Sequence, residues 1–153
     1  MSAWITITLE DLNDYLAGAQ VDAINTAATA EGQTDRFTKV SADIANRIRL
    51  KIESNFRNYI SLTPGTIPPE LKWVACYLII EAMQTAIPGL LLSEDQRKQI
   101  EKADTQLTRI ADGKEVVSKA DDPEVPAESQ RGGKIKQVSG NTRVATRNQL
   151  KGL

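Results

Sequence analysis

The sequence predicts an all-α protein: a small helical bundle around one central apolar helix at about residues 68–87, followed by an extended, largely disordered basic C-terminal arm. Two observations support this fold class. Residues 73–80 are all apolar or aromatic, and further apolar positions continue to Ile87. Apolar residues also recur at helical spacing on both sides of this segment, but the spacing is lost beyond Gly113.

The first elements are short. Thr8 followed by Asp11 approximates a capping box, and leucines at helical spacing predict a short helix over residues 9–16. The alanine-rich stretch that follows predicts a second short helix over residues 20–30. A polar turn at residues 31–35 then separates these elements from the rest of the bundle.

Residues 38–60 have the clearest amphipathic pattern in the chain. Isoleucines at 44, 48 and 52 are followed by Phe56 and Tyr59 at steps of four, four, four and three residues, which predicts one long helix. We assign Ile48, Ile52 and Phe56 to the core. The cations on the other sides of the helix, such as Arg47, have two interpretations: an ordinary solvated face, or a cationic surface that meets an acidic partner.

The central helix has clear boundaries. Pro68-Pro69 opens it, because proline is tolerated in the first helical turn, and Pro88-Gly89 ends it. A helix that is apolar on all sides belongs either in a membrane or in the centre of a bundle. Charged residues interrupt the apolar run before it reaches the length of a bilayer, so we predict a bundle core. The core residues assigned here are Leu71, Trp73, Val74, Tyr77 and Leu78.

A last helix should cover the central one from outside. Ser93 and Gln96 form a capping box, and Gly113 is suited to end the helix. The apolar stripe between them occupies one side only. Its residue Leu107 is the last member of the predicted core.

Charge divides the chain into three parts. Residues 1–113 carry 15 acidic and 11 basic residues, a net charge of −4, and we interpret them as one helical domain. Residues 114–130 have a net charge of −3 and read as an acidic linker. Residues 131–153 carry six basic residues and no acidic one, and we call them the basic arm.

The basic arm is the predicted partner-binding segment. It combines cations with widely spaced apolar residues, which is typical of a segment that becomes ordered against a partner. It has no aromatic residue for stacking on nucleic-acid bases. The residues assigned to partner binding are Arg131, Lys134, Ile135, Lys136, Val138, Arg143, Val144, Arg147, Leu150 and Lys151.

The sequence does not indicate an enzyme. It has no histidine and no phosphate-binding glycine loop, and it therefore lacks the usual nucleophile–base pairs. We expect no catalytic residue, no cofactor and no metal. Cys76 lies within the apolar run and is interpreted as a small buried hydrophobe. The N-terminus has no secretion signal, so we expect the protein to be made in the cytoplasm.

The order of elements resembles a tailed-phage family, the Mu-like head-morphogenesis proteins, which are similar in layout to head–tail connector (adaptor) proteins. The likeness covers about residues 4–117. It is carried by Thr8-Leu9-Glu10-Asp11-Leu12, by Ile67-Pro68-Pro69-Glu70-Leu71-Lys72 and by Ile110-Ala111-Asp112-Gly113-Lys114.

The resemblance implies a structural role. Connector subunits form a ring, commonly of twelve copies, on the portal protein in the virion neck between head and tail. The ring extends the channel through which double-stranded DNA passes, and it contacts this DNA without sequence specificity. The ring also seats the next neck or tail protein. The resemblance implies no membrane contact, and assembly takes place in the host cytoplasm.

A second function class stays open at this stage: a small, non-enzymatic DNA-binding protein that uses the 38–60 helix and the basic arm on phosphates. The acidic body argues against it, and so does the absence of helix-turn-helix spacing. Binding that collapses with added salt would favour DNA binding, whereas binding to the portal without DNA would favour the connector.

Overall fold

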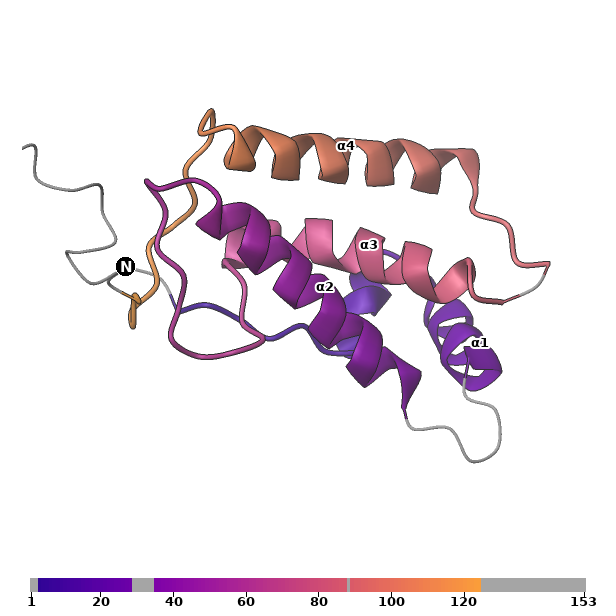
Figure 1. Ribbon diagram of the computed structural model, residues 1–153. Helices are drawn as coiled ribbons and strands as arrows, with labels where there is room; N and C mark the ends of the chain where they lie inside the picture. The colour runs from indigo at the N-terminus through magenta and orange to yellow at the C-terminus, as the bar shows by residue number, and fades with distance from the viewer. Residues whose placement is uncertain (1–2, 29–34, 88, 125–153) are drawn as a thin grey trace, which may run out of the picture.

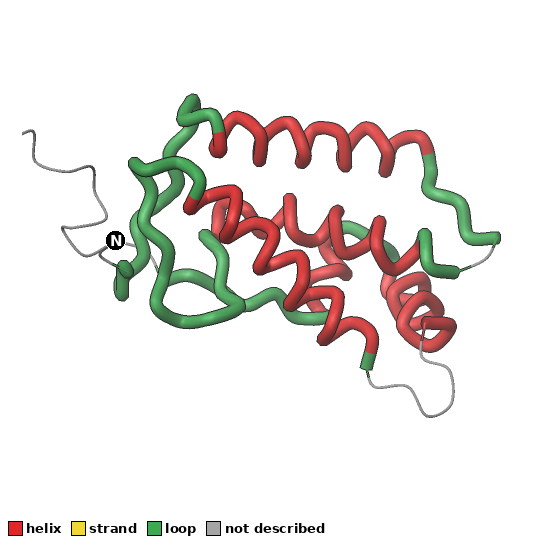
Figure 2. Tube along the Cα trace, in the orientation of Figure 1, coloured by secondary structure: helices red, strands yellow, loops and turns green. Residues whose placement is uncertain are grey.

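The computed structural model describes residues 3–28, 35–87 and 89–124, and within them the protein is helical, as predicted (Figures 1 and 2). No β-strand occurs in these ranges; two isolated bridges pair Ile5 with Ile67 and Ser61 with Pro123. The elements are the 3₁₀ helix η1 (Glu10–Asp14), α1 (Gly18–Ala28), α2 (Arg36–Glu53), the 3₁₀ helix η2 (Pro69–Leu71), α3 (Lys72–Gln84) and α4 (Glu94–Ala111).

Helix α3 is the centre of the bundle. It lies between α2 and α4 and contacts each of the other helical elements (Figure 1). Leu71, Val74 and Leu78 are buried, as predicted. The assignment of Trp73 and Tyr77 to the core is correct only in part, because both are half-buried and pack against the outside of the core. None of the described helices is long and apolar enough to cross a bilayer.

Helix α2 ends earlier than its apolar pattern predicts. Ile48 and Ile52 are fully buried, as predicted, but the helix stops at Glu53 instead of continuing to residue 60. The side-chain Oδ1 of Asn55 accepts a hydrogen bond from the backbone N–H of Arg57 (3.1 Å). Asparagine side chains often bond to the nearby backbone in this way, and the bond competes with the helical backbone pairing.

The assignment of Phe56 to the core is therefore wrong. Its side chain is 82% exposed, whereas Asn55 and Asn58 are buried in its place. The four-residue step from Ile52 keeps a residue on the same face only while the helix continues, and here the helix has already ended.

Helix α4 covers α3 as predicted. Ser93 Oγ accepts the N–H of Gln96 (3.2 Å), and Gln96 Oε1 accepts the N–H of Ser93 (2.8 Å), so the capping box is complete. Leu107 is buried, as predicted. Gly113 follows the helix with φ of +76°, the left-handed conformation that glycine adopts most readily after a helix.

The body extends past Gly113, which corrects the predicted start of the acidic linker. Residues 114–124 run back along the bundle, beside the loop of residues 54–68 (Figure 1). Val117 and Ala120 are buried in the same core cluster as α3. The acidic composition of this segment indicates a linker, but its polar groups find partners on the body, as described below.

Candidate functional site

The predicted partner-binding residues of the basic arm all lie outside the described residues. The described chain ends at Glu124, and six further residues precede the arm in the sequence. Two features of the body are candidate sites: the surface beside Glu124, and a groove elsewhere on the bundle.

The chain end is held first through Ser118. The carboxylate of Glu70 accepts the backbone N–H of Ser118 at Oε1 (2.6 Å) and its hydroxyl at Oε2 (2.8 Å). The indole Nε1 of Trp4 donates to the Ser118 carbonyl (3.2 Å). Residues from the beginning, middle and end of the body therefore meet at one backbone position.

A second anchor lies close to the end of the described chain. Asp122 accepts hydrogen bonds from the hydroxyls of Ser61 (2.7 Å) and Thr63 (2.8 Å), and these two bonds lower the pKa of its carboxyl group. The backbone N–H of Glu124 donates to the carbonyl of Ile60 (2.7 Å). The place where the chain leaves the bundle is therefore fixed on the loop of residues 54–68.

Two buried asparagines, Asn55 and Asn58, also join the loop of residues 54–68 to the segment of residues 114–124. Asn55 Nδ2 donates to the carbonyl of Glu115 (3.5 Å), and Asn58 Oδ1 accepts the N–H of Val117 (3.3 Å). In the sequence, Phe56 stands between these two asparagines, and Val116 stands between their partners Glu115 and Val117. The pairing thus places Phe56 and Val116 on adjoining turns.

We define the exit surface as the exposed apolar residues of these paired segments: Phe56, Leu62 and Val116. They are 82%, 62% and 61% exposed. The guanidinium of Arg57 lies 5.8 Å from the centre of the Phe56 ring, so a cation stands beside the largest of the three. Exposed apolar side chains on firmly held segments are candidates for contact with another protein.

Two of the five cations of α2 have partners within the body. Arg49 donates to the carbonyls of Ser61 (2.7 Å), Thr63 (3.1 Å) and Thr66 (3.0 Å). Arg47 forms an ion pair with Asp104 on α4 (2.9 Å). Arg47 and Arg49 are therefore less available to an outside partner, which weakens the interpretation of this helix as a cationic binding surface.

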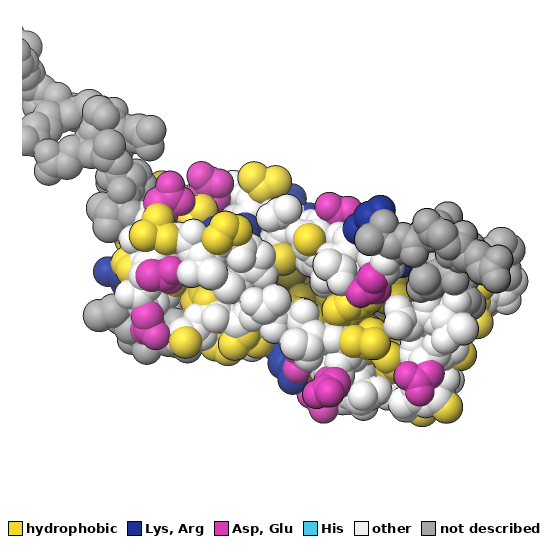
Figure 3. Space-filling model, turned by 90° about the horizontal axis from the view of Figure 1, so that it is seen from below, with side chains coloured by type: hydrophobic (Ala, Val, Ile, Leu, Met, Phe, Trp, Pro, Cys, Tyr) yellow, Lys and Arg dark blue, Asp and Glu magenta, His cyan; other side chains and the backbone are white. Residues whose placement is uncertain are grey.

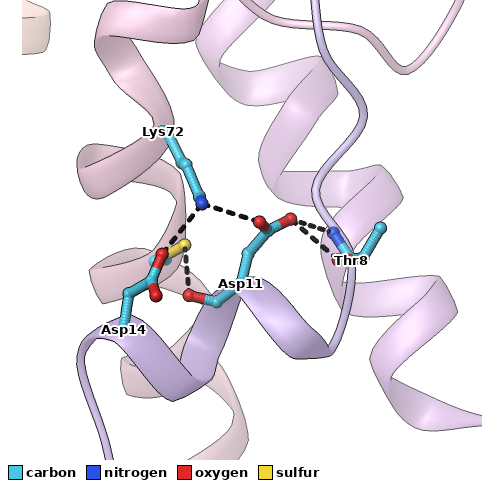
Figure 4. A network of polar contacts seen from close by, with 5 residues as sticks. Thr8, Asp11, Asp14 and Lys72 are labelled. Atoms are coloured by element: carbon cyan, nitrogen blue, oxygen red, sulfur yellow. Dashed lines mark hydrogen bonds and ion pairs between the residues drawn. The ribbon is translucent and has the colours of Figure 1, made fainter.

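A compact polar network joins η1 to α3 (Figure 4). Lys72 Nζ lies 2.7 Å from Asp11 Oδ1 and 2.9 Å from Asp14 Oδ2. Asp11 Oδ2 accepts the N–H (2.7 Å) and the hydroxyl (2.9 Å) of Thr8. Burial acts to raise the pKa of Asp11, but the bonds from Lys72 and Thr8 outweigh it and lower this pKa. The hydrogen bonds to Asp11 and Asp14 raise the pKa of Lys72.

Cys76 borders this network without taking a chemical role in it. Its Sγ lies 3.8 Å from the carbonyl oxygen of Asp11, and its side chain is fully buried. Burial raises the pKa of the Cys76 thiol to about 12, so the reactive thiolate is scarce at neutral pH. We therefore interpret the network as a structural contact that holds η1 on α3, and Cys76 as a packing residue beside it.

A groove of about 570 Å³ opens between α1, α3 and the start of α4. We call it the glutamine groove after Gln84, which lines it. Gln84 is only 5% exposed, yet its Oε1 has no hydrogen-bond partner within the described part of the protein. The lining combines aromatic, aliphatic and amide side chains with one hydroxyl and one carboxylate. The main ones are Tyr15, Leu16, Gln20, Ile24, Tyr77, Leu90, Leu91, Asp95, Gln96 and Gln99.

In the described ranges, no group of three or more acidic or cysteine side chains comes together that could hold a metal ion.

In comparisons with models of known protein families, with curated proteins and with solved structures, no match to this chain was found. The resemblance to phage connectors therefore rests on the sequence motifs alone.

Sequence reasoning missed both surfaces of the body. The signal for Leu62 and Val116 was weak, since each lies in a short, mostly polar stretch without helical spacing. Leu90 and Leu91 stand out in the sequence as a brief apolar elbow, but nothing there places them opposite Tyr15 and Gln84. Only the packing of α1 and α4 on α3 creates the groove.

Proposed function

We propose that this protein is a non-enzymatic structural connector of a tailed phage. In this proposal it forms a ring on the portal protein, extends the DNA channel and seats the next neck or tail component. It is assembled in the host cytoplasm and ends in the neck of the virion. The observation that carries the proposal is the exit surface: Phe56, Leu62 and Val116 are exposed on segments that hydrogen bonds join at the C-terminal end of the described body.

The exit surface suits docking on another protein because its support is fixed. Hydrogen bonds that Asn55 donates and that Asn58 and Asp122 accept hold both of its segments, so little further ordering is needed on binding. Burying a Phe, Leu or Val side chain contributes on the order of 1.5–3 kcal/mol. Three such residues are enough for the centre of a small interface, which a few residues commonly dominate.

The basic arm would add attraction by charge to this apolar contact. It follows the described body after a short stretch of sequence, so a partner that binds the exit surface can also engage the arm. Linking two weak contacts in this way raises the overall affinity without any new interaction.

The net negative charge of residues 1–113 also fits a channel. DNA moves past an acidic wall without being held by it. The engagement of Arg47 and Arg49 within the body gives the DNA-binding alternative less support than the sequence alone did.

The proposal can be tested by mixing the full chain with rings of the portal protein from the same phage, in the absence of DNA. We expect cosedimentation, and added rings of subunits in electron micrographs. The double variant Phe56→Ser/Leu62→Ser should lose most of this binding.

Leu50→Ser is the matched control, because Leu50 is also an exposed leucine (66%) but lies on α2, outside the exit surface. Portal binding unchanged in the double variant would contradict the role of the exit surface. Failure of the wild-type chain to bind portal, together with salt-sensitive binding to DNA, would favour the alternative.

A further inference from the structure

The glutamine groove and the exit of the chain lie at opposite ends of the bundle. The groove is bordered by α1 and the start of α4, whereas residues 112–124 lie at the other end of α4 (Figure 1). Helix α4, with 18 residues, separates them by about 27 Å at 1.5 Å per residue.

Among the described residues, none donates a hydrogen bond to Gln84 Oε1 in the groove. A buried carbonyl oxygen of this kind is normally paired, because leaving it unpaired costs about 1–3 kcal/mol. The side-chain amide is 5% exposed and lines the groove, so a ligand lying there could donate an N–H to Oε1. A peptide backbone or a basic side chain carries such donors.

The rest of the lining favours a peptide that is both cationic and apolar. Tyr15 and Tyr77 pack edge to face with ring centres 5.3 Å apart, and aromatic rings attract cations as well as aliphatic groups. Leu91 is 82% exposed, and Asp95 provides a carboxylate. The described lining includes no lysine or arginine. Seen from below, the surface of the body carries acidic side chains in several places and basic ones in only a few (Figure 3).

We propose that the glutamine groove binds the basic arm, residues 131–153, of a second copy of this chain. The arm has the complementary composition: six cations, no acidic residue, and the spaced apolar residues Ile135, Val138, Val144 and Leu150. A volume of about 570 Å³ falls within the ordinary range of binding pockets.

The opposite placement of groove and exit favours a second copy as the occupant. One end of each subunit supplies the arm and the other end receives one, which is a head-to-tail contact, and such contacts form rings when the rotation between subunits closes. Ile135 lies eleven positions after Glu124, and this stretch can span roughly 36 Å at 3.3 Å per residue. This is enough to reach an adjacent subunit. The inference rests on the proposed function in taking that subunit as the ring neighbour.

Disulfide trapping between two full-length chains tests the proposal directly. One chain carries Leu91→Cys in the groove, and the other carries Val138→Cys in the arm and a tag that distinguishes its mass. Native Cys76 is buried and its thiol has a pKa of about 12, so it should not compete. We expect a disulfide between the two different chains under mild oxidation. A docked arm should raise its yield about tenfold over the control, through its higher local concentration.

The matched control replaces Leu91→Cys with Leu50→Cys, an exposed leucine away from the groove. Adding Gln84→Leu to the Leu91→Cys chain removes the acceptor and should lower the yield severalfold. Equal yields at positions 91 and 50 would overturn the proposal. So would a disulfide that forms only within one chain carrying both Leu91→Cys and Val138→Cys, because the arm would then fold back on its own subunit.

These results separate the inference from the proposed function. Portal-bound rings that show no link between groove and arm would defeat the inference alone. A link that forms in solution, from a chain that does not bind portal, would support the inference and count against the connector.

Discussion

Glu70 and Ser118 are 48 positions apart in the sequence, yet both carboxylate oxygens of Glu70 accept hydrogen bonds from Ser118. Glu70 belongs to η2, at the entrance of the central helix, and Ser118 belongs to the segment that follows the last helix. This pair ties the end of the body to its core, and it defines where the domain stops.

Truncation tests this boundary. A chain ending at Glu124 keeps the anchors at Ser118 and Asp122 and should unfold at nearly the same urea concentration as the full chain. A chain ending at Gly113 loses the buried residues Val117 and Ala120, so its free energy of unfolding should fall by roughly 2–4 kcal/mol. Circular dichroism during urea titration measures both. Equal stability of the two shortened chains would show that residues 114–124 contribute nothing to the fold.

Leu78 lies in the core and Trp73 lies at its margin, so substitutions of the two should differ in their effect on stability. Leu78 is 1% exposed, so Leu78→Ala should cost about 2–5 kcal/mol through lost burial and a cavity. Trp73 is half-buried, and Trp73→Ala should cost less despite the larger side chain that it removes. Leu50→Ala, at a 66% exposed position, is the control and should stay within about 0.5 kcal/mol of the wild type. A larger loss for Trp73→Ala than for Leu78→Ala would reverse this order.

Asp11 should make the stability depend on acid pH. Its pKa is lower in the folded protein than the ordinary value of 3.8, so its stabilising effect is complete above that value and is lost as the pH falls below it. Asp11→Asn should lower stability at pH 7, and the difference from wild type should shrink between pH 4 and pH 2. Urea titrations at several pH values measure this. Asp43→Asn, at an exposed position on α2, is the control. A constant difference at all pH values would contradict the role given to the charge.

Cys76 should resist thiol reagents while the protein is folded. With a thiol pKa of about 12, the thiolate fraction at pH 8 is on the order of a thousandfold smaller than in a free cysteine, and burial slows access further. An aromatic disulfide reagent should therefore react only when a denaturant is added, and the absorbance of the released thiolate measures the rate. Fast labelling of the native protein would show that η1 opens readily from α3.

The features that could be predicted from the sequence are those with local causes. The capping box of Ser93 and Gln96 lies within four residues, and the stripe that contains Leu107 repeats within one helix. The apolar helix α3 could be placed in the centre because no side of it suits water. In the same way, the spacing of Ile48 and Ile52 correctly predicts which side of α2 is buried.

The features that could not be predicted depend on contacts between distant residues. Phe56 continues the spacing of Ile52 and is nevertheless exposed, because the Asn55 side chain pairs with the backbone and the helix ends. Residues 114–124 have the composition of a linker, but Trp4 donates to Ser118 across 114 positions and helps to hold them on the body. Composition cannot show such partners.

The sequence by itself determined that this protein is helical, which helix is central, and that a cationic segment follows an acidic body, since these properties follow from spacing, capping and charge along the chain. Only the tertiary structure decided that residues 114–124 belong to the body, that Phe56 and Val116 are exposed on adjoining turns, and that Gln84 Oε1 is buried in a groove with no partner among the described residues. The reason is physical: burial and hydrogen bonding of these residues are set by segments that the chain brings together only when it folds.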